Sequence, residues 1–165
     1  MARNMNAKGR QKNPPGLWLQ HRILDSRNYA ALSSKAVKLL VDIGTQYRGK
    51  NNGDLTATWE LMKLRGWKSK ATLSDARDEL IHYGFLILTR QGGRMKPNLY
   101  ALSWQPIDYC KGKLDVPSTT VPSNDWMAEV AAFVPKRKRP VPRQSGQLGC
   151  MVGASNDEIS KILPA

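Results

Sequence analysis

Apolar residues between Ser33 and Tyr47 recur with the 3.6-residue period of an α-helix. Ser33 stands just before the pattern, where a serine typically caps a helix by accepting a hydrogen bond from a backbone N–H. The sequence therefore predicts a first helix from Ser34 to about Tyr47. The positions that follow the period are Ala36, Val37, Leu40, Ile43 and Tyr47.

A second, shorter helix is predicted after a loop at 48–54 that is dense in Gly, Asn and Asp. Such residues accept left-handed backbone conformations and are typical of turns. The loop leads into a short extended segment, Leu55-Thr56. Thr58 can then cap a brief helix, which Gly66 should end by adopting a left-handed conformation.

The third predicted helix, over residues 69–83, begins at the capping residue Ser69 and is stopped by Gly84. Its apolar residues form a single stripe. The next residue, Phe85, is placed to contact the helix across the terminal glycine. The stripe consists of Leu73, Ala76, Leu80 and Tyr83.

Two β-strands are predicted from the pattern that follows, one from Phe85 to Arg90 and one from Asn98 to Trp104. The segment between them contains two adjacent glycines, which favour a turn. The strands therefore form a hairpin. Three cations and no acid lie at its tip: Arg90, Arg94 and Lys96.

Charge divides the 165-residue chain into three parts. Its 26 Lys and Arg residues against 13 Asp and Glu give a net charge of +13, which attracts polyanions. Residues 1–16 are expected to form a disordered basic arm, 17–104 the folded domain, and 105–165 an extended, Pro-interrupted basic region. Two clusters of cations in the outer parts, at 3–12 and 136–143, suit sequence-independent contact with phosphates. They consist of Arg3, Lys8, Arg10, Lys12, Lys136, Arg137, Lys138, Arg139 and Arg143.

The order of helix, short strand, two helices and hairpin predicts a mainly α fold with a small β-hairpin. Residues 17–104 resemble small bacterial winged helix-turn-helix proteins, whose close members are uncharacterised. They are similar, more loosely, to MarR-type regulators and to winged domains of phage and plasmid replication initiators. The stretches that carry the resemblance are Leu32-Ser33-Ser34-Lys35-Ala36, Asn52-Gly53-Asp54-Leu55, Trp67-Lys68-Ser69-Lys70-Ala71-Thr72-Leu73, Glu79-Leu80-Ile81-His82-Tyr83-Gly84-Phe85 and Asn98-Leu99-Tyr100.

The resemblance implies that helix 69–83 enters the major groove of double-stranded DNA while the hairpin contacts the sugar–phosphate backbone. Lys70 and Arg77 would donate to guanine, and hydroxyl groups would contact phosphate or a base edge. Thr56 and Thr58 would anchor a phosphate. The full set of implied DNA contacts is Lys68, Ser69, Lys70, Thr72, Ser74, Arg77, Thr56, Thr58, Arg90, Arg94 and Lys96.

Three acidic residues count against DNA reading by this helix, because Asp75, Asp78 and Glu79 match its cations in number. The helix could instead pack on a protein partner, and the hairpin cations could be a solvated edge that keeps strands from pairing. Four aromatic residues could stack on bases, although packing in the core is the default. They are Trp59, Trp67, Tyr100 and Trp104.

Two short helices are predicted in the last third of the chain, at 125–134 and 156–163. The first places apolar residues on one side before Pro135. The second follows a capping-box spacing at Ser155 and Glu158. Such short helices are marginal alone, so Asp125–Val134 and Ser155–Leu163 are candidate contacts with the domain, a second copy or a protein partner.

No catalytic motif or metal-ligand spacing is found, so we expect no enzyme, no cofactor and no metal. Cys110 and Cys150 form no CxxC pair and are expected to be reduced thiols. No apolar run approaches the ~20 residues that cross a bilayer. The predicted location is cytoplasmic, at the nucleoid.

These observations favour a non-enzymatic regulator of transcription that binds double-stranded DNA, in a bacterium or a mobile element. Two alternatives stay open. One is a replication-initiation or accessory factor whose winged domain binds DNA while residues 105–165 recruit a protein. The other is an adaptor whose winged domain binds only protein.

Overall fold

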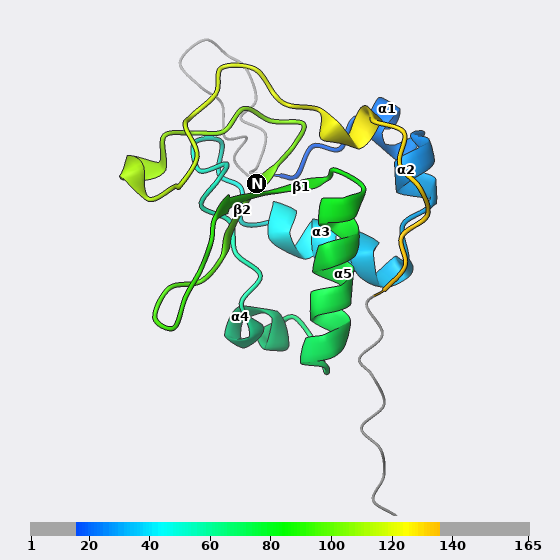
Figure 1. The fold of residues 1–165 in the computed structure, drawn as a ribbon, viewed down its shortest axis with the longest axis horizontal. Helices are drawn as coiled ribbons and strands as arrows, with labels where there is room; N and C mark the ends of the chain where they lie inside the picture. The colour runs from blue at the N-terminus through cyan, green and yellow to red at the C-terminus, as the bar shows by residue number, and fades with distance from the viewer. Residues whose placement is uncertain (1–15, 136–165) are drawn as a thin grey trace, which may run out of the picture.

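The computed structural model describes residues 16–135, which form a mainly helical fold with one small antiparallel sheet (Figure 1). The predicted fold class is confirmed at this level. The basic residues at 3–12 and 136–143 and the predicted helix 156–163 lie outside the described residues. The elements are α1 His21–Leu24, α2 Arg27–Ala30, α3 Ser34–Gly44, α4 Trp59–Leu64, α5 Lys70–His82, β1 Leu86–Arg90, β2 Leu99–Leu102 and the 3-10 turns η1 Cys110–Gly112 and η2 Asp125–Met127.

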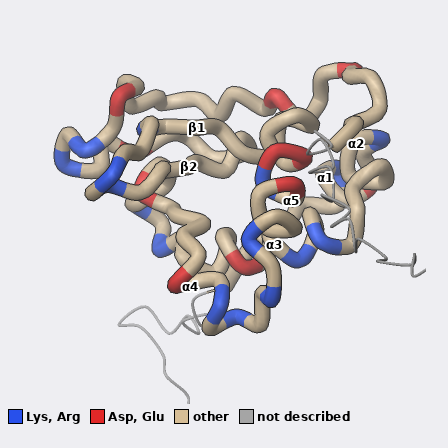
Figure 2. The backbone as a smooth tube through the Cα atoms, turned by 60° about the horizontal axis from the view of Figure 1, so that its bottom comes forward, with Lys and Arg blue, Asp and Glu red and all other residues tan. Residues whose placement is uncertain are grey.

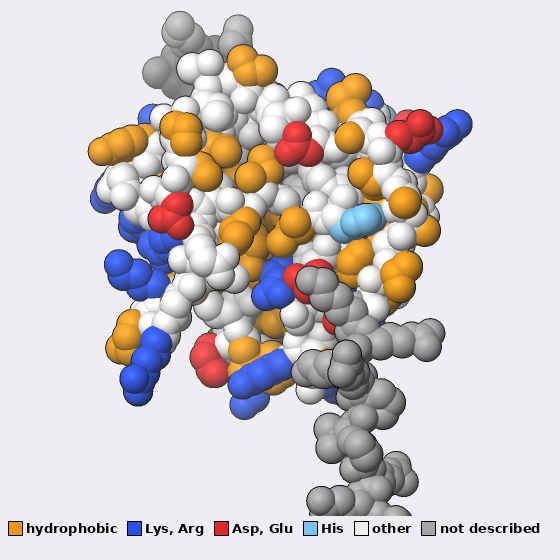
Figure 3. Space-filling model, in the orientation of Figure 1, with side chains coloured by type: hydrophobic (Ala, Val, Ile, Leu, Met, Phe, Trp, Pro, Cys, Tyr) orange, Lys and Arg blue, Asp and Glu red, His pale blue; other side chains and the backbone are white. Residues whose placement is uncertain are grey.

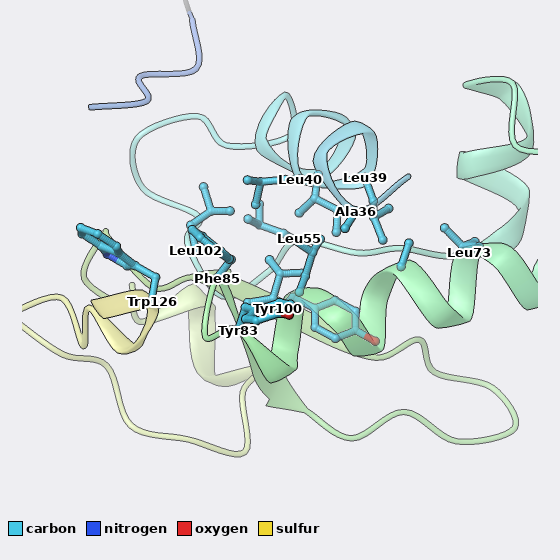
Figure 4. Packing of buried hydrophobic residues seen from close by; sticks show 14 of the residues in the cluster. Ala36, Leu39, Leu40, Leu55, Leu73, Tyr83, Phe85, Tyr100, Leu102 and Trp126 are labelled. Atoms are coloured by element: carbon cyan, nitrogen blue, oxygen red, sulfur yellow. The ribbon is translucent and has the colours of Figure 1, made fainter. Parts of the chain in front are cut away.

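The core lies where α3 and α5 pack against each other and against the sheet (Figure 4). Leu39 and Leu40 of α3 and Leu80 of α5 are fully buried, together with Phe85 after the helix. Leu39 was not among the predicted apolar positions of the first helix, but it lies beside Leu40 on the buried face. Close packing of these side chains supplies most of the driving force for this small fold.

Helix α3 begins as predicted, because the side chain of Ser33 accepts a hydrogen bond from the backbone N–H of Ala36. It ends at Gly44, three residues before the predicted end. Gln46 and Tyr47 donate instead to the carbonyls three residues earlier, which tightens the last turn. A side chain at Gly44 would also collide with Leu17, since a Cβ there would lie 2.7 Å from it.

The ends of α4 and α5 follow the predicted capping pattern. Gly66 and Gly84 adopt left-handed conformations, with φ of +84° and +73°. Ser69 accepts from the N–H of Thr72, and the N–H of Phe85 donates to the carbonyl of Leu80 at 2.9 Å. Thr58 stands at the predicted cap position of α4, but its side chain makes no capping hydrogen bond.

The hairpin pairs β1 with β2, with Leu86 opposite Leu102 and Leu88 opposite Tyr100. The register shifts between Leu88 and Arg90, a β-bulge that bends the first strand. The short strand predicted at Leu55-Thr56 is reduced to one antiparallel bridge between Leu55 and Tyr100. Both predicted hairpin strands are shorter than the apolar pattern indicated.

Residues 105–135, which we call the strap, run over the upper side of the molecule in Figure 1 and then down past α2. The predicted helix 125–134 is wrong: the strap contains only the turn η2 there, and Ala128 after it is extended. The side-chain amide of Asn28 donates to the carbonyls of Trp126 and Ala128 at 2.8 and 2.7 Å. These carbonyls would otherwise accept bonds within that helix, so Asn28 holds the chain in an extended path.

The strap belongs to the packed structure. Trp126 is 3% exposed and lies in the main core cluster, while Ile107 is also buried. The hydroxyl of Tyr83 accepts from the N–H of Phe133 at 3.1 Å, close to where the described chain ends. Packing therefore continues well past Trp104.

Candidate nucleic-acid interface

The hairpin tip, α4 and the N-terminal end of α5 lie along one edge of the molecule, at the bottom of Figure 1. Figure 2 turns this edge toward the viewer and shows Lys and Arg at the hairpin and around the turn between α4 and α5. Figure 3 shows the same two groups at the lower edge of the surface. We call this edge, formed by residues 63–78 and 90–97 with Thr56 and Thr58, the basic edge.

The N-terminal end of α5 presents the predicted cations to solvent. Lys68, Ser69 and Lys70 are exposed, whereas Thr72 and Ser74 are half-buried. The ammonium of Lys70 lies 5.7 Å from the ring centroid of Trp59, within the range of a cation–π contact. This contact orients Lys70 at the start of the helix.

Arg77 is held within the protein rather than extended into solvent. Its Nε and Nη2 donate to Asp78 at 3.0 and 2.7 Å, and Nη2 also donates to Ser74 at 2.9 Å. Burial acts to lower the pKa of Arg77, but the hydrogen bonds and charges of Asp78 and Tyr100 outweigh it, so the pKa lies above its ordinary value. The Arg77 side chain is therefore a fixed cation, oriented by its own helix.

The acidic residues of α5 do not cancel its exposed cations. Glu79 is buried and turns to α3, where its carboxylate accepts from the N–H and hydroxyl of Ser33 at 2.6 and 2.7 Å. Asp78 is paired with Arg77 at 2.7 Å. Asp75 is the one acid of α5 that is exposed. The exposed surface of α5 is therefore more positive than the equal numbers of acids and cations in its sequence indicate.

The three hairpin cations have two different environments. Arg94 and Lys96 are exposed at the tip, beside Met95, which is 89% exposed. Arg90 is half-buried and donates to the carbonyls of Pro97 at 3.2 Å and Lys113 at 3.4 Å. Its Nε has no hydrogen-bond partner within residues 16–135. Arg90 thus ties the hairpin to the strap, while the other two face solvent.

A polar hollow of about 310 Å³ separates the hairpin from residues 56–58, which precede α4, and from α5. It brings together four residues that were predicted to contact DNA and that lie far apart in the sequence. Its walls also include the buried residue Tyr100. The four predicted residues are Thr56, Thr58, Arg77 and Lys96.

The sequence interpretation missed the cations of α3. Lys35 and Lys38 line a second hollow, of about 290 Å³, together with Lys68, Ser69 and Thr72. Lys38 is partly neutralised by Asp42 at 2.6 Å. Lys35 and Lys38 are three positions apart, so they share the side of the helix that faces away from the core. This spacing is the sequence signal that could have identified them.

The aromatic residues are mostly structural. Trp67, Tyr100 and Trp104 are 5% exposed or less, and only Trp59 is half-buried. Trp18, which no pattern singled out, is 74% exposed. Packing in the core therefore accounts for three of the four candidates for base stacking.

Within residues 16–135, no group of three His, Cys, Asp or Glu side chains is arranged to hold a metal ion. In the same range, no helix has the length and apolar character to cross a membrane. No protein-family model, curated protein or solved structure matches this chain significantly.

Proposed function

We propose that the chain binds double-stranded DNA through the basic edge, and that residues 17–104 form a winged helix-turn-helix domain. The arrangement of α3, α4 and α5 with the β1–β2 hairpin and the Leu55 bridge supports this fold. The observation that carries the function is that exposed cations from two separate segments gather on one edge. Two of the three acids of α5 are meanwhile engaged within the protein.

In this proposal the N-terminal half of α5 enters the major groove. Lys70 is the residue placed to donate to a base, because it is exposed and oriented by Trp59. Asp75 is placed to accept from a cytosine amine, which gives an exposed acid a use on a DNA-binding surface. Arg94 and Lys96 contact phosphates on the flanking backbone.

The role that accords with this binding is regulation of transcription, which the resemblance to winged helix-turn-helix proteins implies. A sequence-selective protein needs contacts to base edges as well as to phosphates. The basic edge offers both kinds of group within one surface. The strap lies on the other side and leaves this edge open (Figure 1).

The test is selection of bound fragments from a random double-stranded DNA library at about 150 mM salt, where nonspecific binding is weak. We expect the parent chain to enrich a motif. Lys70→Ala should weaken binding to that motif by about 1–3 kcal/mol and leave other sequences little changed. The matched control is Lys50→Ala, which removes an exposed cation from the loop after α3.

Absence of a motif, with equal retention of DNA by the parent and Lys70→Ala, would overturn the proposal. It would mean that the net charge attracts DNA without reading it. The adaptor hypothesis would then be the better account of the exposed α5 surface.

A further inference from the structure

The polar hollow between the hairpin, residues 56–58 and α5 is lined by donors, and none of the described residues in its walls is acidic. Its charged lining residues are Arg77 and Lys96, and its other lining side chains come from Thr, Asn, Tyr, Pro and Ala. A cavity with this lining and a volume of about 310 Å³ is suited to an anion with several oxygen atoms.

Two hydroxyl groups of the hollow have hydrogen-bonding capacity that the protein does not use. The Tyr100 oxygen accepts from the side-chain amide of Asn98 at 3.2 Å, but no residue within 16–135 accepts the Tyr100 hydroxyl proton. Tyr100 is 2% exposed, and it is one of the residues that line the hollow. The Thr58 hydroxyl has no hydrogen bond to any part of the described chain, although Thr58 occupies a cap position.

A hydroxyl that donates to no protein group can donate to an oxygen of a bound anion. Arg77 adds a guanidinium whose position is set by Asp78 and Ser74 rather than by a ligand. The hollow thus holds an oriented cation beside a buried O–H donor. This combination is a preorganised site for a phosphate, because Arg and hydroxyl donors match phosphate oxygens.

We propose that this hollow is a phosphate site in which Arg77, Tyr100 and Thr58 donate to the phosphate oxygens and Lys96 closes the outer side. The inference rests on the proposed function, because DNA bound along the basic edge would place a backbone phosphate at the hollow. Arg77 then acts as a phosphate contact instead of a reader of guanine. The same chemistry also suits a free phosphate compound.

The experiment measures the affinity of the full chain for two probes, inorganic pyrophosphate by calorimetry and a short DNA duplex by fluorescence anisotropy. The test variants are Tyr100→Phe, which removes one hydroxyl and keeps the ring, and Thr58→Val. The matched control is Tyr83→Phe, which removes a buried hydroxyl near the other end of α5. We expect Tyr100→Phe to lower the affinity for both probes about tenfold, which is the effect of removing one hydrogen bond to a charged group. Tyr83→Phe should leave both affinities unchanged.

The outcomes separate the two proposals. If the duplex binds and both test variants bind it and pyrophosphate as the parent does, the phosphate site is overturned and the proposed function stands. If pyrophosphate binding falls in Tyr100→Phe but no duplex binds, the site is supported with a free phosphate compound as ligand, and the proposed function fails. Should Tyr100→Phe not fold, parental affinities in Thr58→Val would overturn the site.

Discussion

The hairpin tip and the strap are both largely irregular, yet they are held in opposite ways. At the tip, Arg94, Met95 and Lys96 are exposed, and one bridge between Gly93 and Lys96 closes the turn. The strap buries Trp126 and receives hydrogen bonds from side chains far upstream. Absence of regular secondary structure therefore does not mark a segment as unstructured. The tip contributes little to the core, which leaves its side chains for a ligand.

The strongest test of this contrast is Trp126→Ala. It should lower the free energy of unfolding by about 3–5 kcal/mol, because it removes a large buried side chain and leaves a cavity. Urea denaturation of the full chain measures the change. Trp18→Ala removes an exposed indole and should change stability by no more than about 0.5 kcal/mol. Equal effects of the two variants would show that the strap is not part of the core.

A second test removes the asparagines that hold the strap. The Asn52 amide nitrogen donates to the carbonyls of Leu102, Gln105 and Pro106 at 2.9–3.0 Å, and its oxygen accepts from Leu102 N–H at 2.7 Å. Asn52→Ala should therefore lower the free energy of unfolding by at least about 2 kcal/mol, since several buried groups lose their partners.

Asn28→Ala removes a donor to two carbonyls and should cost about 1–2 kcal/mol by the same reasoning. Gln91→Ala is the control, because it removes an exposed amide from the hairpin tip. The stability changes of Asn52→Ala, Asn28→Ala and Gln91→Ala are measured from their denaturation midpoints, provided that the m-value is unchanged. A stability loss in Gln91→Ala as large as in Asn28→Ala would contradict the division between the two regions.

The hairpin tip should show the reverse behaviour. Arg94→Ala/Lys96→Ala should change stability by less than about 0.5 kcal/mol, as expected for exposed residues. The salt dependence of DNA binding should become shallower by about one unit of log–log slope for each phosphate that the variant no longer neutralises. Arg48→Ala/Lys50→Ala removes the same charge from the exposed loop after α3. The prediction fails if this control changes the slope as much.

The smallest effect concerns the thiol of the strap. Burial raises the pKa of Cys110, and the nearby carboxylates Asp54 and Asp108 raise it further. Because the thiolate is the reactive form, Cys110 should react with a disulfide reagent near neutral pH more slowly than free cysteine. The rate is measured in a Cys150→Ser background, with and without denaturant. A folded-state rate equal to that of free cysteine would contradict this environment.

Local signals in the sequence predicted α3, α4, α5 and the hairpin. Ser33, Ser69, Gly66 and Gly84 act within one helical turn, so their effect can be read from neighbouring residues. The helices α1 and α2 were missed because four-residue helices show no period. The path of the strap depends on Asn28, about a hundred positions away from its partners. No local pattern contains that pairing.

In the candidate site, too, the sequence predicted local features but not contacts between distant residues. The exposed cations at the hairpin and at the start of α5 were predicted because charge and turn residues are local features. The engagement of Glu79 by Ser33, 46 positions away, was not predictable, and it changed the charge of the exposed surface. Arg77 was predicted as a base reader, but its bonds to Asp78 and Ser74 give it a fixed place beside the hollow.

Asn52 also sets a limit on the chemical lifetime of the protein. Asn52 is followed by Gly53, and an Asn-Gly pair in a flexible chain deamidates readily because no side chain shields the attacking backbone nitrogen. In the folded chain Asn52 is fully buried and its amide is engaged on both sides, which protects it. Deamidation during transient unfolding would place a carboxylate against three carbonyl oxygens, and refolding would bury an unpaired charge. Each opening of the strap therefore exposes Asn52 to an irreversible change that the closed fold prevents.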